Sequence, residues 1–181
     1  MSTRILRAET ATPAALAPFG FWLGRDAVAP VIRSPFYGDA LAMKKPADFV
    51  GDDTLEITVA TLNRRPLRVT WLERHFLHTQ TFIPLGGKPF LAVLAPPSDG
   101  DMPDLDAARA FLFEGSAGIA LRLGTWHEFP MAVVDQTDVL VLVRRDTVRD
   151  LKSVVGNEAH GPDLDKKDIV ARTGITIEVV L

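Results

Sequence analysis

The chain of 181 residues contains no cysteine, which excludes disulfide bonds, thiolate metal sites and cysteine nucleophiles. It also has no apolar run of the roughly 18 residues that a membrane-spanning helix requires. The first residues, MSTRILRAET, include no apolar stretch like that of a secretory signal peptide. We therefore expect a soluble, cytoplasmic protein that does not contact a membrane.

Positive charge is also scarce, with a formal net charge of -3 at pH 7 and a pI near 5.8. The two arginine pairs, Arg64-Arg65 and Arg144-Arg145, are too short to form a basic patch, so no nucleic-acid partner is expected. Hydrophobic residues make up 47% of the chain, which at this length is enough for one sizeable core. The composition therefore predicts a single domain over residues 1–181.

Strand patterns dominate the sequence. Apolar and polar residues alternate over 55–60 and 175–179, as in half-buried strands. Many short strands with few helices are typical of a β-barrel or sandwich. The expected organisation is N-terminal strands and loops over 1–54, a barrel core over 55–143, and a C-terminal extension over 144–181 that ends in a strand.

Helices are expected to be few and short. One begins at Pro13, with Thr12 as its N-cap. The segment 105–114 is rich in alanine and leucine and is followed by a glycine, which predicts a second helix. The charged segment 144–167 is expected to hold a short helix followed by a loop around Gly161-Pro162.

The stretch 67–97 organises the rest of the chain. Alternate residues of its first strand share one face, which begins apolar and ends with a carboxylate and an imidazole. A turn at Gly86-Gly87 then leads into another apolar strand. Such a face is typical of a barrel interior that is packed at one end and holds a site at the other. In order, it carries Leu67, Val69, Trp71, Glu73 and His75.

This spacing resembles the two sequence motifs of the cupin superfamily. Glu73-x-His75, Gln80 and Gly87 match the first motif, which normally reads His-x-His, Glu and Gly, and Gly124-x-x-His127 matches the end of the second. The resemblance implies a mainly β, cupin-type double-stranded β-helix with a few short helices. It also implies a possible divalent metal ion held by Glu73, His75, Gln80 and His127. Neutral Gln80 is a weaker ligand than the carboxylate it replaces.

A closer resemblance covers roughly residues 55–143. Leu72-Glu73-Arg74-His75 followed by Thr79-Gln80-Thr81-Phe82-Ile83-Pro84-Leu85 is similar to the ERH…TQ-x-FIP segment of the ureidoglycolate lyase family. The resemblance implies a carbon–nitrogen lyase of allantoin and purine catabolism that splits a small-molecule substrate, ureidoglycolate, into glyoxylate and urea. It also implies a homodimer, for which the apolar strands 139–143 and 175–180 are candidate faces. The chain departs from the family at Arg122 and Glu128.

The collapse of ureidoglycolate needs a base for the hydroxyl proton and an acid for the departing urea nitrogen. We expect His75 and His127 to be this pair, since imidazole titrates near neutral pH. Glu73 is expected to orient one imidazole or to share a metal, and Gln80 to hydrogen-bond the ureido group. The alternative is a buried polar pair without chemistry, although ionisable groups on an apolar face are unfavourable unless they are used.

The substrate carboxylate needs a cation, for which Arg122, Lys44 and a bound metal ion are the candidates. Other charged residues are expected to be structural. His78 lies between strands and is interpreted as a solvated loop residue. By alternation Arg74 faces away from His75 and is expected to form an ion pair. The cluster Asp165-Lys166-Lys167-Asp168 is interpreted as solvated charge.

Three functions are therefore open. The first is a ureidoglycolate lyase-like enzyme acting on ureidoglycolate or a related small ureido or hydroxy acid. The second is a metal-dependent cupin enzyme with another specificity, which would carry a stoichiometric metal. The third is a cupin that binds a small ligand without catalysis, in which loss of the histidines would weaken binding only.

Overall fold

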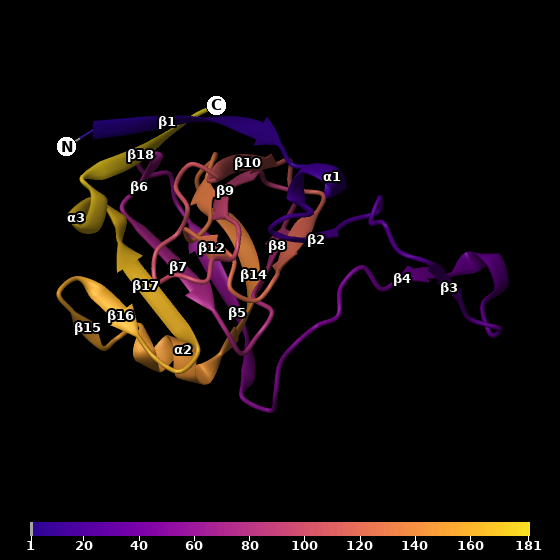
Figure 1. Ribbon diagram of the computed structural model, residues 1–181. Helices are drawn as coiled ribbons and strands as arrows, with labels where there is room; N and C mark the ends of the chain where they lie inside the picture. The colour runs from indigo at the N-terminus through magenta and orange to yellow at the C-terminus, as the bar shows by residue number, and fades with distance from the viewer. Residues whose placement is uncertain (1) are drawn as a thin grey trace.

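The computed structural model describes residues 2–181 and is built mainly from strands (Figure 1). Two sheets face each other. The smaller has the order β2-β11-β8-β14-β5, and the larger contains the consecutive strands β7-β12-β9-β10. Their bounds are β2 (Gly20–Leu23), β5 (Leu55–Leu62), β7 (Trp71–His75), β8 (Thr81–Leu85), β9 (Phe90–Ala95), β10 (Arg109–Phe113), β11 (Gly118–Leu121), β12 (Trp126–His127) and β14 (Thr137–Arg144).

The strand order identifies the architecture. From β5 onward the chain crosses repeatedly between the sheets, with only the hairpin β9–β10 keeping two successive core strands in one sheet, so that one sheet holds β11-β8-β14-β5 and the other β7-β12-β9-β10. Two interlocked Greek keys of eight antiparallel strands make a jelly roll, the fold that cupins share. The predicted mainly β, cupin-type architecture with a few short helices is therefore confirmed.

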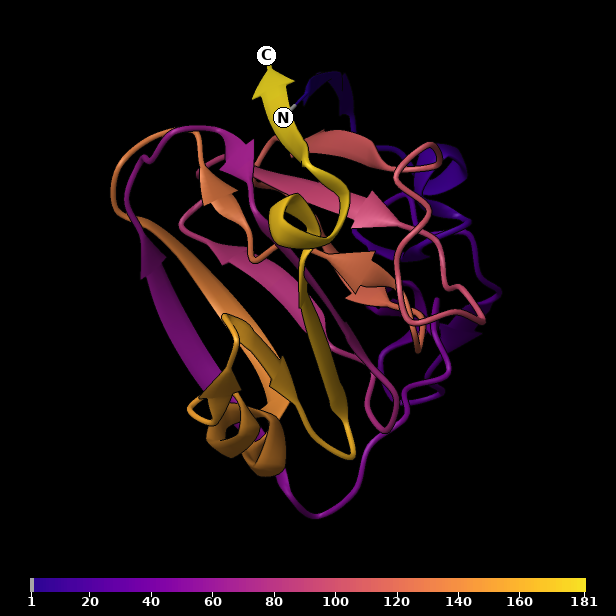
Figure 2. The same cartoon turned by 60° about the vertical axis from the view of Figure 1, so that its left-hand side comes forward.

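The two chain ends widen the larger sheet on both sides. At one edge, β1 pairs in parallel with both β10 and β18, and β18 also pairs with β6; at the other, β17 pairs with β7 and continues into β16 and β15. Figure 2 shows this C-terminal segment in yellow, rising from α2 to β18. The bounds are β1 (Ser2–Thr10), β6 (Arg68–Val69), β13 (Met131–Ala132), β15 (Val154–Val155), β16 (Glu158–His160), β17 (Leu164–Asp168), β18 (Ile175–Val180), α1 (Pro13–Leu16), α2 (Arg145–Asp150) and α3 (Ile169–Thr173).

The strand β9 is apolar throughout because both of its faces are buried. Phe90, Ala92 and Leu94 point into the core between the sheets, whereas Leu91 and Val93 belong to a second core on the outer side of the larger sheet. That second core is closed by β18, α3 and the segment around residues 102–108. The inner face of the larger sheet is covered by the smaller sheet, so polar side chains on this face can form a buried site.

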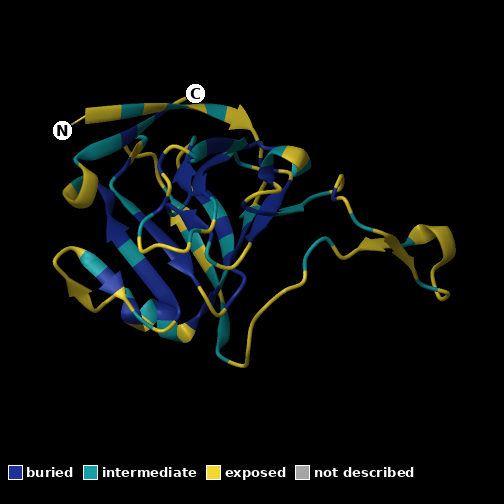
Figure 3. Ribbon diagram, in the orientation of Figure 1, coloured by how far each residue is buried: buried dark blue, intermediate teal, exposed yellow. Residues whose placement is uncertain are grey.

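One segment projects from the body. It carries the small hairpin β3 (Val31–Arg33) and β4 (Ala42–Lys44) with the 3₁₀ turn η1 (Gly38–Ala40) between them. Figures 1 and 3 show this arm extending away from the barrel, with mostly exposed residues. In residues 2–181 no helix has the length and apolar character needed to cross a membrane.

The prediction of a helix over 105–114 is wrong. Residues Arg109–Phe113 form strand β10, with Phe111 opposite Ala92 of β9. Burial overrides the helix propensity of alanine and leucine, because both faces of this strand pack against apolar neighbours. Asp104 accepts backbone hydrogen bonds from Asp106 and Ala107, but it caps a turn instead of a helix.

Other local expectations hold. The short helix after Thr12 is present as α1, and the Thr12 side chain accepts a hydrogen bond from the Ala15 N–H. Gly86 and Gly87 have φ values of 74° and 72° and form the predicted turn. The segment after Arg144 begins with α2 as expected. The loop expected around Gly161-Pro162 is present between β16 and β17, but it is short, because most of residues 154–168 belong to β15, β16 and β17.

Candidate active site

Glu73 lies at the centre of a polar group on the inner face of the larger sheet. It is directly opposite His127 of β12 on one side and Lys166 of β17 on the other. Residues directly opposite in an antiparallel pair share a face, and so do residues two apart on one strand. His75 therefore joins the same face. His127 is in turn opposite Leu94, whose side chain belongs to the core between the sheets.

Two imidazoles converge on one carboxylate oxygen. The Nε2 atoms of His127 and His75 lie 3.6 Å and 3.7 Å from Oε1 of Glu73, and all three side chains are buried. The Nδ1 atom of His127 is 3.1 Å from the Thr125 carbonyl, and that of His75 is 3.2 Å from the Asp163 carbonyl. A carbonyl only accepts, so each Nδ1 carries the ring proton and each neutral ring presents a lone pair at Nε2.

This geometry favours a positive species among the three atoms. Within residues 2–181, neither Nε2 atom has a hydrogen-bond partner. Two nitrogen lone pairs that face a carboxylate oxygen repel it unless a proton or a cation lies between them. The arrangement therefore fits either one protonated imidazole or a divalent cation held by Glu73, His75 and His127, whose ligand atoms lie within 4.8 Å of one another.

The other oxygen of Glu73 is bound by a lysine. Lys166 donates from Nζ to Oε2 over 2.8 Å. Burial by itself raises the pKa of Glu73, but the contacts with His127 and His75 and the positive charge of Lys166 outweigh it, so the pKa lies well below its usual value. Glu73 is therefore an anion at neutral pH, and its negative charge stabilises positive charge on a group beside it.

A second buried pair, His78 and Asp163, lies directly behind His75. The His78 and His75 ring centroids are 4.6 Å apart, and His78 Nδ1 is 2.6 Å from Asp163 Oδ2. Asp163 also accepts from the backbone N–H groups of Phe76 and Leu77 and from the Thr147 hydroxyl. With four donors its carboxylate has little capacity left for a metal.

The pKa values of this second pair reflect the same contacts. Burial tends to raise the pKa of Asp163, but its hydrogen bonds from His78 and the Leu77 N–H lower it to about 2. Burial lowers the pKa of His78 in spite of the neighbouring Asp163. The expectation that His78 is a solvated loop residue is wrong, since strand β17 and the loop before it cover its side chain.

Gln80 is buried, and its Oε1 atom has no hydrogen-bond partner within residues 2–181. Its predicted role toward the ureido group or a metal stays a prediction.

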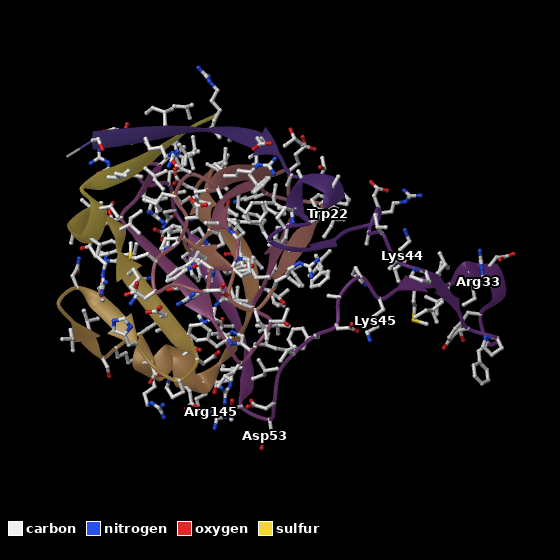
Figure 4. The ribbon with its side chains drawn as sticks, in the orientation of Figure 1. Trp22, Arg33, Lys44, Lys45, Asp53 and Arg145 are labelled. Atoms are coloured by element: carbon white, nitrogen blue, oxygen red, sulfur yellow. The ribbon has the colours of Figure 1, made fainter. Side chains whose placement is uncertain are left out.

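The two side chains predicted to bind the substrate carboxylate, Arg122 and Lys44, make their contacts away from the histidines. Arg122 lies over the Phe21 ring and donates to the Ala17 carbonyl, and Lys44 lies on the projecting arm, well away from the barrel interior (Figure 4). Neither residue contacts the histidines, and the assignment of each to the substrate carboxylate stays a prediction.

Arg74 faces away from His75, as the alternation of β7 predicted. Its guanidinium lies 4.3 Å from the Trp126 ring centroid and 3.2 Å from the Asp165 carboxylate. Both partners are buried. The two faces of β7 are therefore chemically distinct, with a structural ion pair outside and the histidine cluster inside.

Glu128 adds a second carboxyl group near the cluster. It is buried and lies 3.2 Å from an Arg65 guanidinium nitrogen. Burial raises its pKa above the usual value, and the charge of Glu73 acts in the same direction, while Arg65 and Lys166 oppose them. One of the two positions at which the chain departs from the family therefore lies within the electrostatic reach of Glu73.

Lys166 and Asp163 are the site residues that sequence reasoning missed. Both belong to the strand β17 segment, and its pairing with β7 joins residues about 90 positions apart in the chain. The local sequence Leu-Asp-Lys-Lys-Asp resembles a solvated charge run, so it held no signal for this pairing. Their position could be found only once the partner strand was known.

The jelly roll and its buried histidine–carboxylate cluster together define a cupin-type protein with an enclosed polar site. Residues 3–161 match the family model described as ureidoglycolate lyase. The chain is 38% identical over 144 residues to the ureidoglycolate lyase of Azotobacter vinelandii, and this alignment covers 78% of this chain and 86% of that protein. It is 37% identical over 147 residues to that of Pseudomonas fluorescens strain SBW25, covering 80% and 87% respectively.

The chain therefore belongs to the ureidoglycolate lyase family, as the motifs around Glu73 and Gln80 indicated. Among solved structures, RmlC from Streptococcus suis in complex with dTDP-D-xylose matches with a TM-score of 0.33 and 14% identity, covering 50% of this chain and 42% of that one. The family match ends at residue 161, so Asp163 and Lys166 lie just beyond it.

Proposed function

We propose that this protein is a carbon–nitrogen lyase that cleaves ureidoglycolate into glyoxylate and urea. Family membership supports the substrate. The observation that supports the chemistry is the convergence of His75, His127 and Glu73, with Nε2–Oε1 distances of 3.7 Å and 3.6 Å. These three residues are the proposed catalytic group. The cytoplasm, and the breakdown of allantoin within purine catabolism, are the proposed setting.

The reaction is an elimination from a hemiaminal. A base takes the hydroxyl proton, the C–O bond becomes a carbonyl, the C–N bond breaks, and the urea nitrogen takes up a proton. One of His75 and His127 acts as the acid and the other as the base, and the negative charge of Glu73 stabilises the positive charge that the base acquires as it takes up the proton. General acid–base catalysis of this kind contributes roughly 10²–10⁴-fold.

The experiment is to mix the purified protein with racemic ureidoglycolate and to measure glyoxylate and urea over time. We expect both products to form in equal amounts, and faster than in a protein-free control. No release of glyoxylate, with or without added divalent metal, would rule out this substrate. Release of ammonia in place of urea would indicate a hydrolase reaction instead.

The donor set also fits a divalent metal ion. Two imidazoles and one carboxylate are a common ligand set for such ions, and Glu73, His75 and His127 would hold it, with Gln80 as the further candidate. Bound there, a divalent ion supplies Lewis-acid polarisation of a substrate oxygen. Each imidazole is already oriented through its Nδ1 proton by a backbone carbonyl, as metal-binding histidines require.

The same donor set favours the second candidate function, a metal-dependent cupin enzyme of other specificity. Elemental analysis of the purified protein separates the two. A stoichiometric metal that is lost in His75→Ala, together with no turnover of ureidoglycolate, would favour the second function. Turnover of ureidoglycolate would favour the first, whatever the metal content.

We also infer a homodimer, formed through the outer face of the smaller sheet and the projecting arm. Ile57 and Val59 of β5 are 71% and 59% exposed, and Phe36 on the arm is 88% exposed. Of the two strands proposed as dimer faces, β14 presents half-buried Leu140 and Leu142 on this side. In β18, by contrast, Ile177 and Val179 are buried in the core. An apolar face that is repeated in a second copy is suited to a two-fold interface.

Light scattering after size-exclusion chromatography tests the dimer. The wild-type protein should have the mass of two chains, and Ile57→Glu with Val59→Glu should have the mass of one. The matched control is Val154→Glu with Val155→Glu, two exposed valines on β15 that lie outside this face. A monomeric wild-type protein, or an unchanged mass in the β5 variant, would contradict the inference.

A further inference from the structure

The proposed reaction needs a cation for the substrate carboxylate, and the strand β17 supplies one beside the cluster. Lys166 donates one N–H to Glu73 Oε2 over 2.8 Å. A lysine ammonium has three N–H donors. Two therefore remain to bind another acceptor while the contact with Glu73 is kept.

Lys166 lies between the buried cluster and an open pocket. Its side chain is 25% exposed, compared with 4% for Glu73. It lines a pocket of about 310 Å³, together with Trp71, Leu151 and residues of the β15–β16 hairpin. A small acid that enters this pocket can therefore contact the ammonium group of Lys166, with Glu158 as the carboxylate in the same lining.

The other cations near the barrel are held by other partners. Arg65 is paired with Glu128. Lys167, the next residue along, faces the opposite side of β17, where it is buried and lies 3.0 Å from Asp165. Lys166 is therefore the lysine of this strand that combines access from the pocket with a direct contact to Glu73.

We propose that Lys166 binds the substrate carboxylate and thereby places the adjacent reacting carbon against His75 and His127. This inference rests on the proposed function, because it is the substrate of that reaction that carries a carboxylate next to the reacting carbon. Lys166 lies beyond residues 3–161, over which the chain matches the family model.

The test uses glycolate and its neutral analogue glycolamide as probes, together with steady-state kinetics on ureidoglycolate. Loss of a hydrogen-bonded charge pair weakens binding by roughly 10- to 100-fold. Lys166→Met should raise the KM for ureidoglycolate and the inhibition constant of glycolate by that factor, and leave the inhibition constant of glycolamide unchanged. Lys166→Arg should restore most of the glycolate binding.

Lys152, an exposed lysine beside the pocket residue Leu151, supplies the matched control. Lys152→Met should bind both probes like the wild type. Because Lys166→Met leaves Glu73 buried without its cation, folding is checked by thermal melting. The double variant Glu73→Gln with Lys166→Met provides a second binding measurement in which no buried charge is left unpaired.

The outcomes are distinct. Equal loss of glycolate and glycolamide binding in Lys166→Met, or a fall in kcat alone, would show that Lys166 only supports Glu73 and would overturn the carboxylate site. Absence of glycolate binding by the wild type would also overturn it. If glycolate binding depends on Lys166 while ureidoglycolate is not cleaved, the carboxylate site stands and the proposed function fails.

Discussion

The molecule contains two buried histidine–carboxylate groups side by side, and their hydrogen bonding differs. In the His78–Asp163 pair, the carboxylate accepts from four donors and its charge is fully used. In the cluster of Glu73, His75 and His127, two Nε2 atoms face one oxygen at 3.6–3.7 Å without a hydrogen bond. Within residues 2–181, His78 Nε2 also lacks a partner, so the difference between the two groups lies in their carboxylates. The satisfied carboxylate of Asp163 stabilises the fold, whereas the convergent groups around Glu73 are available for a proton, a metal or a substrate.

The largest expected effect concerns the cluster of Glu73, His75 and His127. Replacement of either His75 or His127 by alanine should lower kcat for glyoxylate release by roughly 10²–10⁴-fold, because one proton transfer loses its catalyst. Thermal melting should show that both variants fold. A variant that keeps wild-type kcat would remove that histidine from the proposed acid–base pair.

The second prediction concerns the carboxylate of Asp163, which accepts four hydrogen bonds, and the expected effect is on stability. Asp163→Ala leaves a histidine, a hydroxyl and two backbone N–H groups without their acceptor, so we expect a loss of about 3–5 kcal/mol in the free energy of unfolding. Urea denaturation measures this. As a matched control, Asp138→Ala removes an exposed carboxylate that accepts from the Thr61 hydroxyl and should change stability by less than about 1 kcal/mol. Equal effects of the two would contradict the structural role of Asp163.

Acid should destabilise the protein partly through Asp163. Its folded pKa of about 2 lies below the usual value of 3.8, so the carboxylate contributes stability that is complete above pH 4–5. This stability is lost as the pH falls toward 2, and it amounts to about 2 kcal/mol. The lowered pKa of His78 acts with the same sign, since its unfolded form takes up a proton first. Urea denaturation from pH 7 to 3 should show a smaller loss of stability in Asp163→Asn than in the wild type.

The smallest effect is expected on the outer face of β7. Arg74→Met keeps much of the apolar contact with Trp126 but removes the ion pair with Asp165 and the hydrogen bond to the Ser98 carbonyl. We expect a loss of about 1–3 kcal/mol in the free energy of unfolding and no change in kcat. A fall in kcat at constant stability would contradict the separation of the two faces.

Local pattern predicted the end of β7 well but not its approach. Leu67 and Val69, which were expected inside the barrel, pack in the core on the outer side of the larger sheet, because the strand is interrupted between β6 and β7. Period-two alternation was sufficient to place Glu73 and His75 on the inner face and Arg74 on the outer one, because a strand has little freedom in where its side chains point. The same reasoning failed at residues 109–113, where alanine and leucine suit a helix and only burial on both faces makes a strand. It also failed at His78, whose burial depends on Asp163.

Long-range pairing explains what else was missed. Lys166 reaches Glu73 only because β17 pairs with β7, and the sequence around it is indistinguishable from an exposed charged segment. Arg122 and Lys44 were plausible cations by composition, but their positions depend on α1, on β2 and on the arm, and local pattern does not define these. The sequence therefore shows which cationic residues the chain has, but not which of them lies beside the histidine cluster.

The most direct test of the central role of Glu73 is the single-turnover rate of glyoxylate formation in Glu73→Gln, which keeps the shape of the side chain and removes its charge. If the negative charge of Glu73 stabilises the positive charge that develops on the base imidazole, the rate should fall by at least roughly 10²-fold, while the melting temperature stays close to that of the wild type. A Glu73→Gln protein that forms glyoxylate at the wild-type rate would contradict the account.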